Sequence, residues 1–147
     1  MITTNLRDLQ LENHLYHATP YWNAESVLTR GLKLEFGRNN KQWKKYQCLS
    51  ESPRIASEMV YVSQKDRMKL KGRFDIVIFG FNLALLELSL IDFLDEDPYL
   101  RNGIVTYKDF SPRGIDQIIL YKMSDQEDYT DFFQRSQRRN LNVILAS

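Results

Sequence analysis

The sequence contains little cysteine, glycine, proline or histidine. Its single cysteine excludes a disulfide within the chain and makes a structural zinc site of the usual kind unexpected. Six glycines and four prolines in 147 residues leave no glycine-rich linker, and no internal repeat is visible. We therefore expect one domain over residues 1–147, which is an ordinary size for a domain.

The chain also lacks an excess of charge and a long hydrophobic run. Twenty basic and 19 acidic residues give a net charge of +1, which does not indicate a nucleic acid or a membrane surface as partner. No apolar stretch reaches the ~20 residues of a membrane span. The first ten residues lack the basic start and apolar run of a secretory signal. We expect a cytoplasmic protein with no membrane partner.

Hydrophobic patterning predicts an α+β domain, with helices early and a strand-rich second half. The expected strands cover 15–18, 46–50, 74–81, 103–107, 115–121 and 142–146, and a polar helix covers 124–140. Thr19-Pro20 is typical of a helix start, with Thr19 as N-cap, and Gly31 predicts the end of that helix. Ser52-Pro53 predicts a second helix start, followed by a charged loop over 64–72.

Several kinds of site are not supported by the sequence. The two histidines, His14 and His17, are three residues apart, so they point to opposite faces of a strand, and no metal site is expected there. Cys48 has no catalytic signature around it and is expected to be a small buried residue. Glycine-rich phosphate loops are missing, so any nucleotide must be bound by another geometry.

His17 by itself is most simply a histidine that satisfies a backbone group, but its neighbours form an ordered series. Tyr16-His17-Ala18-Thr19 precedes a helix that ends in Arg30-Gly31-Leu32, and a later strand ends in Leu49-Ser50 before another helix. This series resembles the ADP-ribosyltransferase fold, and within it the RNA 2′-phosphotransferases and the DNA-targeting ADP-ribosyltransferase toxins.

The resemblance implies a split antiparallel sheet with flanking helices and NAD⁺ as co-substrate, whose ADP-ribose is transferred to a protein or nucleic-acid acceptor. It implies roles for two sets of residues. The implied cofactor-binding residues are Tyr16, His17, Ala18, Thr19, Gly31, Leu32 and Ser50, and the implied catalytic residues are His17, Tyr61 and Arg38.

Within this resemblance, His17 would bond the adenosine ribose, the backbone of Ala18 would hold the nicotinamide amide and Ser50 would contact the nicotinamide ribose. Tyr61 would stack on the nicotinamide, although an ordinary half-buried aromatic explains it equally well. Many family members place a catalytic glutamate at the start of a late strand, where this chain has Gly103.

Two alternatives follow from that difference. RNA 2′-phosphotransferases also lack the glutamate and bind a phosphate through arginines, for which Arg38, Arg67 and Arg73 are candidates, unless they are solvated loop charges. The N-terminal lobe of those enzymes has no counterpart here. The second alternative is a catalytically inert module that binds NAD or nucleic acid, with contacts from the basic stretches 41–45 and 135–139.

Overall fold

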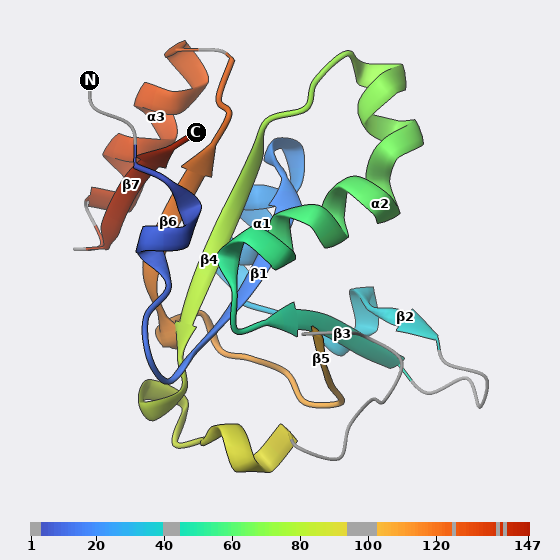
Figure 1. Ribbon diagram of the computed structural model, residues 1–147, viewed down its shortest axis with the longest axis vertical. Coiled ribbons are helices and arrows are strands. Elements are labelled where there is room, and N and C mark those ends of the chain that lie inside the picture. Colours follow the sequence, from blue (N-terminus) through green and yellow to red (C-terminus); the bar gives the residue numbers. More distant parts are fainter. Residues whose placement is uncertain (1–3, 40–44, 94–102, 125, 138, 140) are drawn as a thin grey trace.

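The computed structural model describes residues 4–39, 45–93, 103–124, 126–137, 139 and 141–147. The chain folds as an α+β protein around a mostly antiparallel sheet (Figure 1). The helices are α1 (Ala24–Arg30), α2 (Pro53–Lys71) and α3 (Gln126–Gln137). The strands are β1 (His14–Pro20), β2 (Arg38–Asn39), β3 (Lys45–Ser50), β4 (Ile76–Asn82), β5 (Gly103–Thr106), β6 (Ile115–Tyr121) and β7 (Asn142–Ala146).

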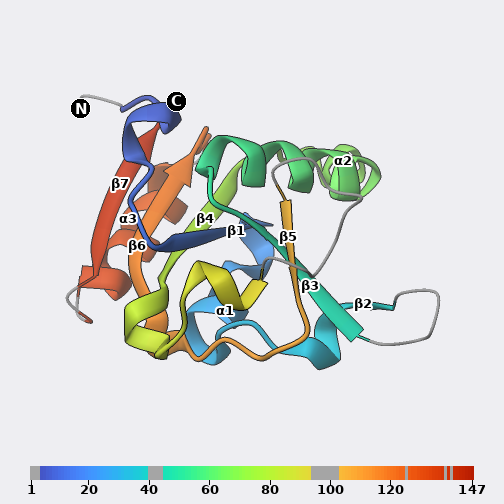
Figure 2. The same ribbon diagram turned by 60° about the horizontal axis from the view of Figure 1, so that its bottom comes forward.

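The sheet has the strand order β2-β3-β1-β4-β6-β7, with β5 paired to β3. All pairs are antiparallel except β6 with β7. β1 pairs with β4 along its whole length, from His14 opposite Asn82 to Pro20 opposite Ile76. Its register with β3 is a single pair, Tyr16 opposite Ser50. Beyond that pair the two strands diverge, so β2, β3 and β5 form a separate wing of the sheet (Figure 2).

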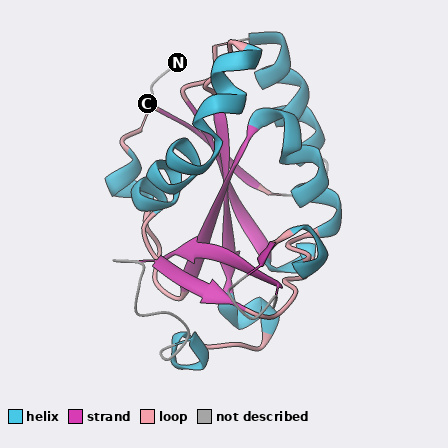
Figure 3. Cartoon of the chain, turned by 90° about the vertical axis from the view of Figure 1, so that its right-hand side faces the viewer, coloured by secondary structure: helices cyan, strands magenta, loops and turns pink. Residues whose placement is uncertain are grey.

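Two hydrophobic clusters cover the two faces of the sheet, with helices on both sides (Figure 3). β4 is buried on both faces, because Val77 and Phe79 belong to the cluster that includes α1 and α3 residues, whereas Ile76 and Ile78 belong to the α2 cluster. A strand buried on both faces is a continuous apolar run. The prediction of a buried central strand near 74–81 is therefore confirmed, with the strand beginning two residues later.

The predicted start of the first helix was wrong. Thr19 and Pro20 are the last residues of β1, and a short 3-10 turn follows before α1 begins at Ala24. Thr19 is buried and paired opposite Val77, so it does not cap the helix. The Thr-Pro pattern of a helix start was misleading because the pairing of β1 with β4 extends through both residues. Pro20 is the last residue of the strand.

The predicted end of that helix at Gly31 is confirmed. Gly31 has φ +72°, and its N–H bonds the carbonyl of Val27 at 2.8 Å. A Cβ at Gly31 would collide with the carbonyl oxygen of Phe110, so glycine is required by conformation and by space. Leu32 does not fold back in a second capping bond to α1. It exchanges two backbone bonds with Phe110, both 2.9 Å long.

The second helix is longer than predicted. Ser52 caps it as expected, since its Oγ accepts from the Ile55 N–H at 3.3 Å. However, α2 continues to Lys71, through the stretch predicted as a loop, and stops at Gly72 with φ +65°. Met68 is fully buried within that stretch. Among the described residues, no helix combines the length and apolar character needed to span a membrane.

Candidate functional site

A pocket of about 1310 Å³ lies where β1 and β3 diverge. Residues of β1, of α1 and the segment after it, of β3 and of α2 line it. Its volume exceeds the ~300–1,000 Å³ typical of sites for drug-sized ligands. It therefore has room for a dinucleotide.

Five of the seven implied cofactor-binding residues line this pocket together. His17, Ala18 and Thr19 come from β1, and Gly31 and Leu32 come from the turn after α1. Cys48 of β3 also lines the pocket, and it is partly exposed rather than buried as expected.

Tyr16, Ser50 and Tyr61 do not line the pocket. Tyr16 is fully buried in the α2-side core, where its hydroxyl accepts from the Leu11 N–H and lies 2.9 Å from Gln117 Oε1. Ser50 is fully buried at the β1–β3 junction, and its Oγ accepts from the Ser52 N–H at 3.1 Å. These two side chains support the wall of the pocket rather than face into it.

Tyr61 faces away from the pocket on α2. Its hydroxyl donates to the carbonyl of Phe74 at 2.8 Å. Burial raises the pKa of this phenol to about 12, and the neighbouring Tyr121 and Asp75 add to the rise. Tyr61 is therefore a protonated donor that fastens α2 to the start of β4, which leaves its ring outside the pocket in this structure.

The three arginines proposed for a phosphate have different surroundings. Arg67 lines the pocket from α2 and is exposed. Arg73 donates two hydrogen bonds to the carboxylate of the buried Asp75. Its guanidinium carbon lies 4.6 Å from the centre of the Tyr21 ring. Arg38 belongs to β2, where it pairs with Tyr46, but its side chain lies outside what the structure describes. Among these arginines, Arg67 is the one whose described side chain lines the pocket and can contact a ligand bound there.

His17 is held in one orientation before any ligand arrives. Its Nδ1 lies 3.2 Å from the carbonyl oxygen of Cys48. Burial lowers the pKa of His17 from 6.5 to about 4, so the ring is neutral at physiological pH. A carbonyl can only accept, so Nδ1 carries the proton and Nε2 presents a lone pair. His17 is therefore fitted to accept a hydrogen bond from a hydroxyl.

Positive charge outweighs negative charge around the pocket. Arg30, Lys33 and Arg67 line it, whereas Glu58 lines it and is 2.6 Å from Arg54. Lys33 is 3.8 Å from Asp109, an exposed and weak pair. Within the described part of the chain, no carboxylate pairs with Arg30 or Arg67. This arrangement suits an anionic ligand such as a diphosphate.

Several lining residues were missed by the sequence analysis, among them Arg30, Met59 and Gln64. Met59 was predicted as part of the apolar face of this helix, and Gln64 fell in the stretch predicted as a charged loop, although both belong to α2 and line the pocket. Arg30 is next to Gly31 and was treated only as part of a helix ending. A helix pattern extended past residue 63 would have placed Gln64 and Arg67 on the same helix as Val60.

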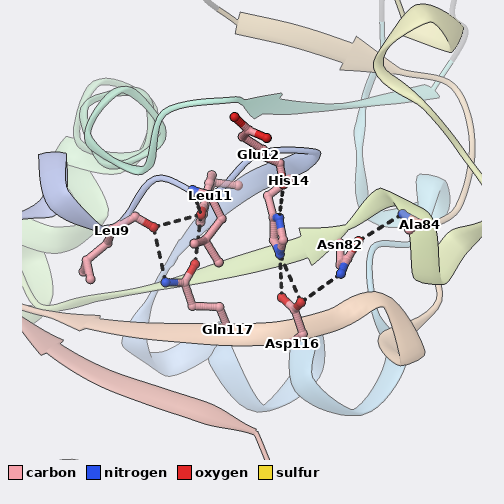
Figure 4. A network of polar contacts seen from close by, with 9 residues as sticks. Leu9, Leu11, Glu12, His14, Asn82, Ala84, Asp116 and Gln117 are labelled. Atoms are coloured by element: carbon pink, nitrogen blue, oxygen red, sulfur yellow. Dashed lines mark hydrogen bonds and ion pairs between the residues drawn. The ribbon is translucent and has the colours of Figure 1, made fainter.

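A second polar cluster lies apart from the pocket, at the start of β1 (Figure 4). His14 Nε2 is 2.9 Å from Asp116 Oδ1, and its Nδ1 is 2.6 Å from the carbonyl of Glu12. Asn82 donates to the same carboxylate at 3.1 Å. The cluster joins β1, β4 and β6 through the Asp116 carboxylate. In the described ranges, no three His, Cys, Asp or Glu side chains gather as a metal site requires.

Two arginines of the basic stretch 135–139, Arg135 and Arg139, bind groups of the protein itself, and Arg138 lies outside the described residues. Arg135 is 2.5 Å from Glu25 and also from Asp131, and Arg139 donates to the carbonyl of Leu28 at 2.5 Å. These arginines hold α3 against α1. The other basic stretch, residues 41–45 with Trp43, lies outside the described residues except for the backbone of Lys45 in β3.

No known family model matches the chain, and no curated protein sequence matches it either. The function proposed below therefore rests on the pocket and on the residues that line it.

Proposed function

We propose that the chain is an NAD-dependent ADP-ribosyltransferase with an ADP-ribosyltransferase-like fold, and that NAD⁺ binds in the pocket between β1, α1, β3 and α2. The observation that carries the proposal is that two segments of the predicted site line one pocket. His17–Thr19 and Gly31–Leu32, which the sequence resemblance assigns to NAD⁺, line the same pocket.

The chemistry of the lining supports this ligand. Nε2 of His17 is the lone-pair end of a neutral ring and suits a ribose hydroxyl. Arg30 and Arg67 come from helices on either side and suit the two phosphates, since guanidinium groups bind phosphate through two donors. Ala18 lies in β1 beyond the pair that joins it to β3, where its backbone can meet a carboxamide.

In the proposed reaction, the bond between the nicotinamide nitrogen and C1′ of the ribose breaks. Nicotinamide leaves with the bonding electron pair, and an acceptor nucleophile bonds to C1′ and loses its proton. Rate acceleration would come from electrostatic stabilisation of the cationic ribose. The start of β5 at Gly103 supplies no side chain for that task.

A second candidate is an enzyme that uses NAD⁺ to remove an RNA 2′-phosphate. It is favoured by Arg67, a pocket-lining guanidinium without a carboxylate partner among the described residues. Both candidates place NAD⁺ in the same pocket and differ in what attacks C1′, which is an acceptor nucleophile in one and a phosphate oxygen in the other.

One experiment separates these candidates. The protein is incubated with NAD⁺ labelled in the adenylate part and with an RNA that carries an internal 2′-phosphate, beside a mixture of cell proteins and nucleic acids. Label retained on a macromolecule supports the transferase, and loss of the 2′-phosphate supports the second candidate. If NAD⁺ binds but neither product forms, the chain is an NAD-binding module without these activities.

A further inference from the structure

We propose that Gln64 is a ligand-binding residue of this pocket and that its side-chain amide oxygen accepts a hydrogen bond from an N–H₂ group of the bound nucleotide. The inference rests on the proposed function for the identity of the nucleotide. It adds a residue with a defined chemical preference, which the sequence resemblance does not assign.

Gln64 is a polar residue in an apolar row. Ala56, Val60 and Met68 follow one another along α2 with Gln64 at the same four-residue spacing, so all four lie along one side of the helix. The other three are at most 5% exposed and belong to the core beneath α2. A glutamine at this position is costly, because its amide needs hydrogen-bond partners that an apolar side chain would not need.

The side-chain amide oxygen of Gln64 has no partner in the protein. Its Oε1 is buried and has no hydrogen-bond partner among the described residues. Buried polar atoms in native proteins nearly always have a partner, and an exception calls for a specific explanation. Gln64 also lines the pocket, together with Ala18 of the same hydrophobic cluster. A bound ligand would provide the missing partner.

The side chain can present its oxygen to a ligand. The last torsion of glutamine has a broad energy profile, so the amide can turn from its covered position toward the pocket when a donor is available there. NAD⁺ carries two N–H₂ groups that could be the donor, the carboxamide of nicotinamide and the 6-amino group of adenine. Both share the chemistry that an amide oxygen recognises.

The test compares the wild-type protein with Gln64→Met, which keeps the length and removes the acceptor. A matched control is Gln134→Met, the same change at an exposed position of α3 away from the pocket. Calorimetry measures the affinity for NAD⁺, for ADP-ribose, which lacks nicotinamide, and for the dinucleotide with hypoxanthine in place of adenine. Thermal unfolding is measured without ligand.

We expect Gln64→Met to bind NAD⁺ about tenfold more weakly, as loss of one hydrogen bond implies. The ligand that lacks the true donor should bind both proteins equally, which identifies the donor. The unfolding temperature without ligand should be unchanged or higher, because an unsatisfied polar atom has been removed.

Equal NAD⁺ affinity in the wild type and Gln64→Met overturns this inference alone. A fall in the unfolding temperature with equal affinity assigns Gln64 a structural role and also overturns it. If the wild-type protein binds neither NAD⁺ nor ADP-ribose at millimolar concentration, the proposed function fails and the inference fails with it.

Discussion

Nδ1 of His17 lies 3.2 Å from the carbonyl oxygen of Cys48, across the point where β1 leaves β3. This contact fixes which ring nitrogen carries the proton, and it orients the ring by a backbone group rather than by a side chain. The lone pair of Nε2 is therefore set before a ligand binds. A preorganised acceptor of this kind loses little freedom on binding.

The lowered pKa of half-buried His17 predicts a loss of stability in mild acid. Its pKa is about 4 in the folded protein and 6.5 in an unfolded chain, so the unfolded chain takes up the proton first as the pH falls. The contribution of neutral His17 to the free energy of unfolding is therefore fully present above pH 6.5. Up to about 3 kcal/mol of it is lost as the pH approaches 4.

Urea unfolding of the wild type and of His17→Gln at a series of pH values between 4 and 7 measures this effect. The carboxylates titrate in both proteins, so the difference between the two curves reports His17. His17→Gln should lose less stability than the wild type across this range. Parallel curves for the two proteins would show that His17 is not held neutral by the fold.

Gly31→Ala should destabilise the protein and damage the pocket. Alanine at φ +72° is strained, and its Cβ would meet the carbonyl of Phe110. Gly72→Ala is a milder comparison, because Gly72 lies in the left-handed α region (φ +65°, ψ +24°) with open space around its Cβ position, whereas Gly31 has ψ −154°, a conformation that is essentially restricted to glycine. We expect a loss of about 1 kcal/mol for Gly72→Ala and at least about 2 kcal/mol for Gly31→Ala.

Denaturant unfolding measures both variants, and calorimetry measures NAD⁺ binding by each. Gly31→Ala should bind NAD⁺ more weakly even where it is folded, because the segment after α1 must move. Gly72→Ala should keep the affinity of the wild type. Equal losses of stability in the two variants would contradict the larger cost predicted for the conformation of Gly31 and its collision with Phe110.

Arg67→Ala should weaken the binding of NAD⁺ and of ADP-ribose alike, by about tenfold at low salt, because both ligands carry the diphosphate. Lys65→Ala removes one positive charge from the same helix at a position outside the pocket and serves as the control. It should change the affinity little. Titrations at two salt concentrations check the assignment, since the Arg67 contribution should shrink as salt rises. An equal effect of both variants would indicate a general charge effect.

Most of the elements could be predicted from local patterns. The strand at 115–121, the cap at Ser52 and the helix end at Gly31 were all identified correctly, since each depends on residues within one or two turns of chain. The start at Thr19-Pro20 was not, because the ladder between β1 and β4 extended the strand through a local helix signal. Pairing between distant segments overrides such a signal.

The candidate site was predictable only in part. His17, Ala18 and Gly31 carry short motifs, so they were found from the sequence, and the fold places them around one pocket. Gln64 carries no motif, and its interest lies in an unsatisfied atom that is defined by three-dimensional burial. Tyr61 was predicted to be catalytic because it lies on the helix after Ser50. Its position on α2 directs its hydroxyl to the carbonyl of Phe74 instead.

Calorimetric titration of NAD⁺ into the wild-type protein and into His17→Ala tests the central proposal most directly. The neutral ring accepts from a ribose hydroxyl in this account, so the wild type should bind NAD⁺ and His17→Ala should show no measurable binding. Circular dichroism confirms that the variant is folded. Unchanged NAD⁺ affinity in a folded His17→Ala, or no binding by the wild type, would contradict the assignment of this pocket.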